Sequence, residues 1–175
     1  MKKFSVLLVA LFFVGFLSIE YASAQGYGSG RVVRKNAAGG VSGASGSAYK
    51  GPNAAGGHAR GFASDGQGNV AGGSARVHNG TNVQGARAGG FTRSSDGTVQ
   101  HKSGAAVNTQ KGSMSTQGQA TKTAEGVSAS RETTATSKST GNSVDSSTSY
   151  DKGTGVTHAH TCYDSSGAAI PCPSK

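Results

Sequence analysis

Large apolar side chains are scarce in this chain. Every Leu lies before residue 18, and the chain has no Trp. From Gln25 onward the large aliphatic and phenyl side chains are eleven Val, two Phe, one Ile and one Met. Because burial of apolar surface contributes about 25 cal/mol per Å², such a segment has little to bury. This scarcity argues against the core of a conventional globular enzyme.

Catalytic patterns are also missing from the sequence. No Ser-His-Asp or Cys-His arrangement stands out from the abundant serine, and no pair of carboxylates lies in an apolar setting that would raise a pKa. No glycine motif that cradles phosphate precedes a helix. We therefore expect no enzyme activity, no catalytic residues, no cofactor and no small-molecule substrate.

The N-terminus predicts export. Two lysines precede an apolar run from about Phe4 to Leu17, and Ala22, Ser23 and Ala24 form the small-residue pattern that a signal peptidase accepts. The run is shorter than the roughly 18 to 20 residues that span a bilayer. We expect residues 1–24 to be a cleaved secretory signal, which leaves no membrane span and places the protein outside the cell, at its surface or in the periplasm.

Only two cysteines are present, Cys162 and Cys172, and a Ser-Ser-Gly turn lies between them. Because exported proteins with two cysteines usually oxidise them, we predict a disulfide and a C-terminal hairpin over residues 157–175. The alternative is a zinc or copper site formed by His158, His160 and Cys162. Side chains at this spacing on one strand are about 7 Å apart, which disfavours a shared metal, so we predict no metal site.

Composition alone would predict disorder, because the chain is rich in Gly and Ser and poor in large apolar residues. The order of the residues favours structure instead. Turn signals such as "DGQGN" at 65, "NGTN" at 79 and "SDGT" at 95 recur along the chain. After most of them comes one larger apolar residue, in the series Val70, Val83, Val99, Met114, Val127, Val144 and Val156. This spacing of roughly 15 residues indicates repeated strands joined by turns.

Between the turns, side chains alternate as they do on strands. In residues 70–78, Val70, Ser74, Arg76 and His78 share one face, and the other face carries only Ala, Gly and Val77. Frequent glycine argues against helix, at about 1 kcal/mol per position. We predict an all-β fold of repetitive Gly/Ala/Ser-rich strands, in a long antiparallel meander or a β-solenoid-like array, with a largely disordered chain as the alternative. We expect a flexible or poorly ordered segment over residues 25–50 and the β-repeat region over residues 51–156.

Positive charge is concentrated in the first part of the chain. Residues 31–124 contain eleven Lys or Arg against two Asp, whereas residues 125–175 contain four basic and five acidic residues. Basic residues arrive about once per strand and would line up as a ladder on a regular sheet. Such a ladder predicts binding of polyanions such as extracellular DNA, polysaccharide or lipopolysaccharide, at Arg60, Arg76, Arg87, Arg93, Lys102, Lys111 and Lys122. The alternative is a charged surface that keeps a sheet protein soluble.

Two functions are consistent with these features. The first is a non-enzymatic exported structural or surface protein, a matrix, fibre or adhesion component built from stacked β repeats that self-associate. The second is a cationic binding protein for envelope or matrix polyanions. Aromatic residues are too few for sequence-specific reading of nucleic acid.

Overall fold

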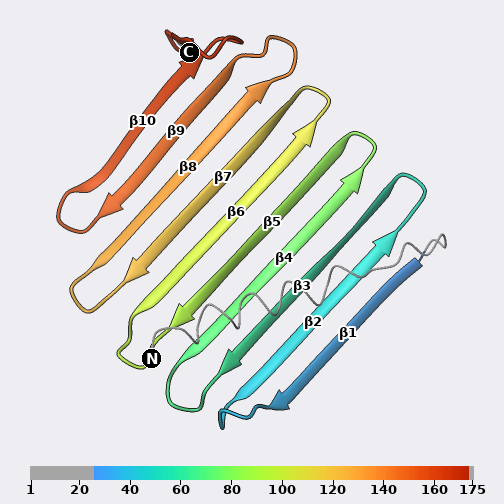
Figure 1. Cartoon of the computed structure of the whole chain (residues 1–175), viewed down its shortest axis with the longest axis vertical. Helices are drawn as coiled ribbons and strands as arrows, with labels where there is room; N and C mark the ends of the chain where they lie inside the picture. The colour runs from blue at the N-terminus through green and yellow to red at the C-terminus, as the bar shows by residue number, and fades with distance from the viewer. Residues whose placement is uncertain (1–25, 174–175) are drawn as a thin grey trace.

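A single antiparallel sheet accounts for most of the chain. The structure, a computed structural model, describes residues 26–173, so the signal predicted over residues 1–24 lies outside the described residues. Eleven strands follow one another in sequence order across the sheet (Figure 1). They are β1 (Gly26–Lys35), β2 (Val41–Lys50), β3 (Ala54–Ser64), β4 (Val70–Gly80), β5 (Val83–Arg93), β6 (Val99–Thr109), β7 (Gly112–Lys122), β8 (Val127–Ser137), β9 (Ser143–Asp151), β10 (Gly155–Tyr163) and β11 (Ala169–Ile170). The all-β prediction is confirmed, in its meander form.

Residues 26–50 form two full strands, which corrects the expectation of a flexible or poorly ordered segment. β1 and β2 pair along their whole length, from Gly26 opposite Lys50 to Lys35 opposite Val41. The turn between them is closed by Asn36, whose side-chain oxygen accepts from the backbone N–H groups of Ala38 and Gly40. The repeat region therefore begins at β1 and runs through β10, beyond the predicted limits of residues 51 and 156.

The repeating unit is a pair of strands, 29 residues long over the first part of the sheet. Glycines with positive φ close equivalent turns at Gly39, Gly68 and Gly97. Five residues separate the paired strand ends at these turns, whereas only two separate β4 from β5 and β6 from β7. Along the sheet, long turns at one end of the strands thus alternate with short turns at the other end. Residues 29 apart consequently lie on the same face, two strands and about 10 Å apart.

Asp and Asn side chains organise several of the long turns. The Asp65 carboxylate accepts from the backbone N–H groups of Gln67 and Asn69 and from the Asn69 side chain. The side-chain bond from Asn69, followed by the backbone bond from Gln67, lowers the pKa of Asp65 below its ordinary value. Asp164 makes the same kind of turn after β10, and its pKa is lowered mainly by the Ser166 side chain. Neighbouring turns also bond to each other, as where the Ser95 N–H donates to the Asn69 side chain.

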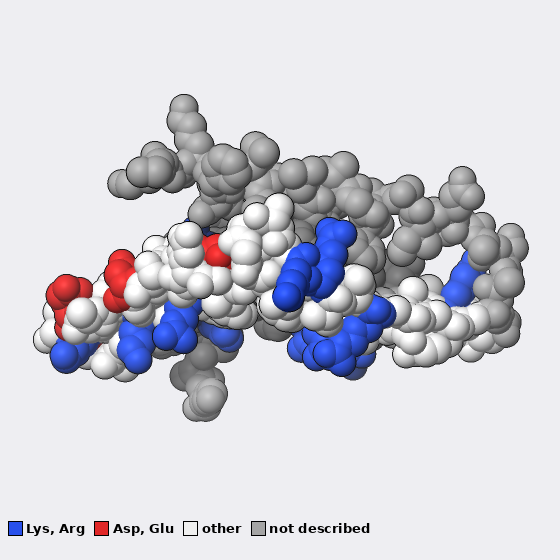
Figure 2. Space-filling model, turned by 90° about the horizontal axis from the view of Figure 1, so that it is seen from below, with Lys and Arg blue, Asp and Glu red and all other residues white. Residues whose placement is uncertain are grey.

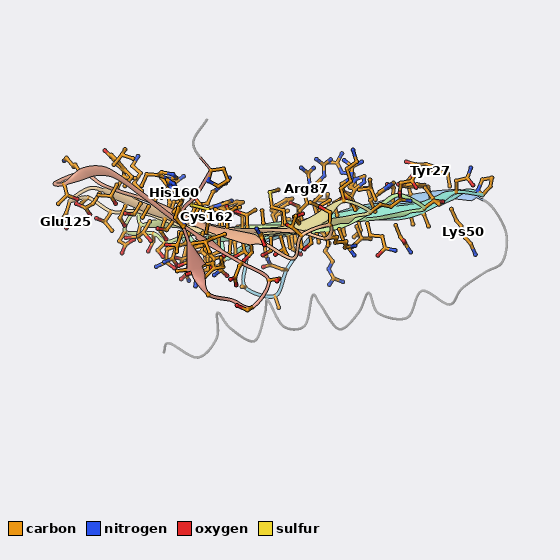
Figure 3. All side chains as sticks on the ribbon, turned by 90° about the horizontal axis from the view of Figure 1, so that it is seen from above. Tyr27, Lys50, Arg87, Glu125, His160 and Cys162 are labelled. Carbon is orange, nitrogen blue, oxygen red and sulfur yellow. A yellow bond between two sulfur atoms is a disulfide. The ribbon has the colours of Figure 1, made fainter. Side chains whose placement is uncertain are left out.

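The sheet is a single layer without a packed core. Viewed edge-on, side chains project from both sides of one ribbon layer (Figure 3). Among the described residues the only buried apolar side chain is Cys162, which is 8% exposed. Within residues 26–173 no helix is long and apolar enough to cross a membrane. Backbone pairing and contacts between side chains of neighbouring strands, rather than burial between layers, therefore hold the described chain together.

The register assigns each strand residue to one of two faces, because directly opposed residues in an antiparallel pair point to the same side. We call the side that carries Arg31, Arg60, Arg76 and Arg87 the arginine face, and the other side the reverse face. In Figure 3, Tyr27 and Arg87 project from one side and Lys50 from the other. Of the thirteen exposed large apolar side chains, all but Val32 and Val77 belong to the arginine face.

Candidate functional site: the arginine face

Charge is distributed unequally between the two faces. In the ten long strands the arginine face has eight cations and no carboxylate: Arg31, Lys35, Arg60, Arg76, Arg87, Arg93, Lys122 and Arg131. The reverse face of these strands balances three cations against three acids: Arg34, Lys50, Lys102, Glu132, Asp145 and Asp151. In Figure 2 most of the visible Lys and Arg side chains gather along the lower side, and the Asp and Glu side chains lie toward the upper side. The positive field of the strands therefore belongs to one face.

Histidine follows the same distribution. All five histidines of the chain lie on the arginine face: His58, His78, His101, His158 and His160. Two of them are hydrogen bonded to hydroxyls on the neighbouring strand, His58 to Ser47 at 2.9 Å and His158 to Thr148 at 2.8 Å. The imidazoles of the chain are therefore confined to the face that carries the eight strand cations.

A shallow groove crosses the arginine face at right angles to the strands. Its floor is a row of small side chains directly opposite one another on successive strands: Ser45, Ser74, Gly89, Ser103 and Gly118, interrupted at β3 by Arg60. One wall, which we call the aromatic wall, contains Phe62, Phe91 and His101. The other, which we call the cationic wall, contains His58, Arg76 and Arg87. Arg31 on β1 and Arg131 on β8 stand at its two ends. The depression has a volume of about 1060 Å³.

Glycines support the aromatic wall. Phe62 is directly opposite both Gly43 and Gly72, and Phe91 is directly opposite Gly72. A Cβ atom placed on Gly72 would lie 2.7 Å from Cε1 of Phe91, and one on Gly43 would lie 2.8 Å from Cε1 of Phe62. Each phenyl ring therefore lies over the backbone of a neighbouring glycine, and the absence of side chains there makes this position available.

The register places three arginines in or beside the floor of the groove. The Nε–H group of Arg60 donates to Oγ of Ser45 at 3.0 Å, which engages one of the five N–H donors of its guanidinium. Arg76 lies directly opposite Arg87 on the next strand and opposite His58 on the strand before. One histidine and two arginines thus stand in one row on β3, β4 and β5.

The structure brings together five of the seven residues predicted to bind polyanions. Arg60, Arg76, Arg87, Arg93 and Lys122 share the arginine face. Lys102 lies on the reverse face, opposite Gly90 and Gln119, and Lys111 lies in the turn between β6 and β7. A count of one cation per strand had placed Lys102 in this set, but Lys102 follows His101, and the two-residue alternation of a strand directs it to the other side.

Three further cations of this face were missed by the sequence analysis. Arg31 and Lys35 were assigned to the segment expected to be flexible, although Arg31 lies opposite Ser45 in the groove row. Arg131 was grouped with the acidic last part of the chain, yet it lies opposite Gly118 and lines the groove. The usable signal was alternation within each strand, because the acids near Arg131, such as Glu132, occupy positions of opposite parity.

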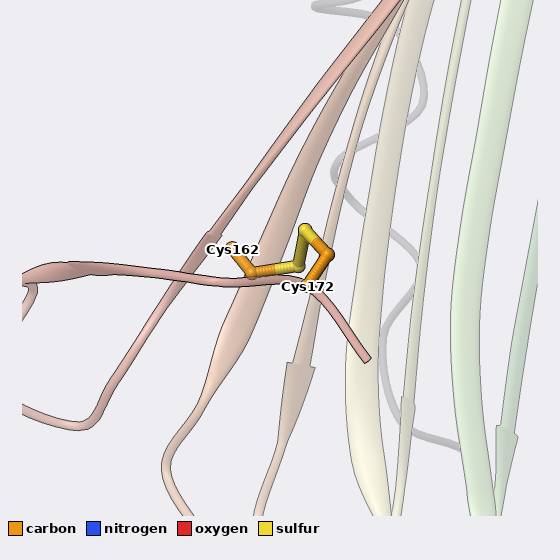
Figure 4. Close-up of a disulfide and its surroundings, with 2 residues drawn as sticks. All are labelled: Cys162 and Cys172. Atoms are coloured by element: carbon orange, nitrogen blue, oxygen red, sulfur yellow. A yellow bond between two sulfur atoms is a disulfide. The ribbon is translucent and has the colours of Figure 1, made fainter. Parts of the chain in front are cut away.

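The C-terminal stretch contains the predicted disulfide. Cys162 on β10 is bonded to Cys172, with Cα atoms 5.3 Å apart (Figure 4). The rings of His158 and His160 lie 5.9 Å apart on the same strand. Because the Cys162 sulfur is used by the disulfide, it is not a thiolate ligand beside these histidines. In residues 26–173 no group of three His, Cys, Asp or Glu side chains is arranged to hold a metal ion.

Comparisons with known proteins identify no relative of this chain. No protein-family model, no curated protein and no solved structure matches the chain.

Proposed function

We propose that this chain is a non-enzymatic, exported structural protein of a cell surface or extracellular matrix, in which sheets stack on one another. The observation that supports the proposal is a flat surface on the reverse face, which we call the small-residue surface. It consists only of Gly and Ala apart from Val77, and it covers five neighbouring strands: Ala44, Gly46, Ala48, Gly57, Ala59, Gly61, Ala63, Ala71, Gly73, Ala75, Val77, Ala86, Ala88, Gly90, Gly104 and Ala106. Small side chains allow two sheets to approach closely and interdigitate.

Charge favours a second copy against this surface rather than against the arginine face. Two arginine faces would bring eight cations against eight without a strand carboxylate between them, whereas the small-residue surface contains no charged side chain. The five strands contribute stretches of five, seven, seven, five and three residues to this surface, which at about 4.8 Å between strands and about 3.4 Å per residue give roughly 440 Å² per copy. A pair would bury roughly 900 Å², less than a stable protein interface of standard size, so we expect the contact between two copies to be weak and assembly to require high protein concentration.

The stacking proposal is tested by placing a charge on the small-residue surface. Ala75→Glu puts a carboxylate at its centre, and Ser149→Glu, on β9 of the same reverse face, is the matched control. We expect sedimentation velocity to show dimers or larger assemblies for the native chain and for Ser149→Glu, and monomers for Ala75→Glu. A native chain that stays monomeric at every concentration would refute the proposal.

A second function is supported by the charge difference between the faces. We propose that the arginine face binds polyanions of the envelope or matrix, because eight strand cations without a strand carboxylate attract anionic polymers over several ångströms. Such binding weakens with salt, since screening and counterion release reduce it. Titration with dextran sulfate at about 50 mM and about 200 mM salt tests this. Equal affinity at both concentrations, or no binding at either, would exclude it.

A further inference from the structure

The groove on the arginine face has the dimensions of a site for one extended polymer chain. It runs from Arg31 on β1 to Arg131 on β8, a distance of about 34 Å at the usual strand spacing. Its walls stand two positions on either side of the floor row, so their backbones are about 14 Å apart. The side chains of both walls occupy part of this width. The remaining space fits a single polymer chain and is too narrow for a nucleic acid duplex.

The cationic wall lacks an internal counterion. Arg76 and Arg87 are directly opposed, and Arg60 projects from the adjoining floor row. Directly opposed like charges destabilise a sheet, and no strand position on this face offers a carboxylate to offset them. An anionic ligand in the groove would neutralise these charges and could take bidentate hydrogen bonds from the guanidinium groups.

The aromatic wall indicates which kind of polyanion fits. Phe62 and Phe91 are 29 residues apart, so they lie in one row two strands, or about 10 Å, apart, with Gly72 between them. Each ring is 42% exposed. Rings this far apart cannot stack successive bases of a single-stranded nucleic acid, which requires closely following aromatic platforms. The spacing instead resembles the length of two sugar rings joined end to end, and the C–H face of a sugar packs well on phenyl.

We infer that the groove binds a linear acidic polysaccharide laid across the strands, with carboxylates on Arg60, Arg76 and Arg87 and sugar rings against Phe62 and Phe91. The inference rests on the second proposed function, polyanion binding by the arginine face, and names its site and its ligand class. The hydroxyls of Ser45, Ser74 and Ser103 on the floor provide hydrogen-bonding partners for sugar hydroxyl groups.

The inference is tested by calorimetric titration of the purified protein with oligogalacturonates of increasing length and with oligo-dT of matched charge. We expect the affinity for oligogalacturonate to rise with length until the chain spans the groove and then to level off. Oligo-dT of equal charge should bind more weakly. Tighter binding of oligo-dT would overturn the assignment in favour of single-stranded nucleic acid.

Variants separate the groove from general charge attraction. The double substitution Arg76→Gln and Arg87→Gln should weaken oligogalacturonate binding by about tenfold or more, as expected for charge-assisted hydrogen bonds. Arg34→Gln with Lys102→Gln removes the same charge from the reverse face and should leave the affinity within about twofold. Circular dichroism and thermal unfolding confirm that both variants keep the sheet.

The aromatic wall has its own readout. Phe62→Leu with Phe91→Leu should weaken oligogalacturonate binding and leave its salt dependence unchanged, because no charge is removed. If polyanions bind but neither groove variant differs from the reverse-face control, the groove is not the site, although polyanion binding stands. If neither dextran sulfate nor oligogalacturonate binds, the second proposed function fails together with the inference.

Discussion

Arg76 and Arg87 stand directly opposite each other on β4 and β5, on a face whose strands carry no carboxylate. Opposed like charges on neighbouring strands are normally avoided, because they lower the stability of the sheet by roughly 0.2 to 1 kcal/mol. Their stems can pack along neighbouring side chains while the guanidinium groups stay in water, but the repulsion between the groups persists. The proposed binding of polyanions to this face would give the pair a role, because an anionic ligand would neutralise both guanidinium groups.

Replacement of one member of the pair should therefore stabilise the free protein. We expect Arg87→Gln to raise the free energy of unfolding by about 0.2 to 1 kcal/mol at low ionic strength, and the gain should shrink in high salt because screening already removes the repulsion. Urea denaturation at two salt concentrations measures this. Arg34→Gln is the control, because Arg34 lies opposite Ser42 and has no directly opposed cation. Equal effects of the two substitutions would show that the pair does not repel in the free protein.

Much of the fold follows from local patterns in the sequence. Turn residues located the hairpins, two-residue alternation separated Arg76 from Ala75, and the lack of large apolar residues agreed with a layer that has no core. These properties are local, because turn chemistry and side-chain parity depend on a few neighbouring residues. They were enough to predict an all-β array of strands, with meander and solenoid both left open, whereas the disulfide was predicted from the presence of two cysteines in a chain expected to be exported.

The two-strand period and the groove depend on register between strands, which was harder to infer. The gap of 13 residues from Val70 to Val83 crosses a short turn, and the gap of 16 from Val83 to Val99 crosses a long one. Taken one by one, the two gaps resemble an irregular single-strand repeat of roughly 15 residues, although together they give the 29-residue unit. Without that unit, Phe62 and Phe91 could not be placed in one row, nor Lys102 assigned to the other face.

Gly72 is predicted to be intolerant of a side chain because of the ring beside it. A Cβ at this position would meet Cε1 of Phe91 at 2.7 Å and Cζ at 3.1 Å. We expect Gly72→Ala to displace the ring and to lower the free energy of unfolding by about 1 kcal/mol. Thermal and urea denaturation measure the loss, and near-ultraviolet absorption of the phenylalanines reports the displaced ring.

Gly104→Ala is the matched control for this effect. Gly104 also lies in a central strand, but the nearest atom to a new Cβ is the Thr116 carbonyl oxygen at 3.5 Å, an ordinary contact. Because Ala restricts the unfolded chain more than Gly does, this substitution should be neutral or stabilising by about 0.4 to 1 kcal/mol. Equal losses at the two positions would mean that the ring does not determine the need for glycine at 72.

Asp65 should make the stability of the β3–β4 turn sensitive to acid. Its pKa is lowered in the folded state, first by the Asn69 side chain and then by the backbone N–H of Gln67. A group with a lowered pKa binds fewer protons when folded, so its contribution is fully present above the ordinary aspartate pKa of about 3.9 and is lost as the pH falls through the folded value. We expect Asp65→Asn to reduce the loss of stability between about pH 5 and pH 2.

We expect Asp65→Asn to keep the turn. The side chain of Asn36, which is neutral, accepts the equivalent backbone hydrogen bonds in the turn between β1 and β2. Urea denaturation across this pH range tests the expectation, and stability at neutral pH should change little. Asp164, whose pKa is lowered mainly by the Ser166 side chain, and Glu125, whose pKa is lowered mainly by the Thr123 side chain, remain in the variant and contribute residual acid dependence. An unchanged pH profile would show that Asp65 is not coupled to folding.

Loss of the disulfide should affect the C-terminal end of the sheet most strongly. The bond between Cys162 and Cys172 closes a loop with a sequence separation of 10, and such a crosslink contributes about 2 to 3 kcal/mol by restricting the unfolded chain. β11 pairs with β10 only through Cys162 opposite Ile170 and Tyr163 opposite Ala169, so without the crosslink it has little to hold it. We expect the double substitution of both cysteines by Ser to release β11, with fast hydrogen exchange from residue 163 onward and unchanged exchange in β3–β6.

Ser166→Ala removes the 2.7 Å bond to Asp164 in the same loop but keeps the crosslink, so it should leave β11 protected. Exchange in β11 that is equally fast in the oxidised native chain would show that the disulfide does not hold this strand.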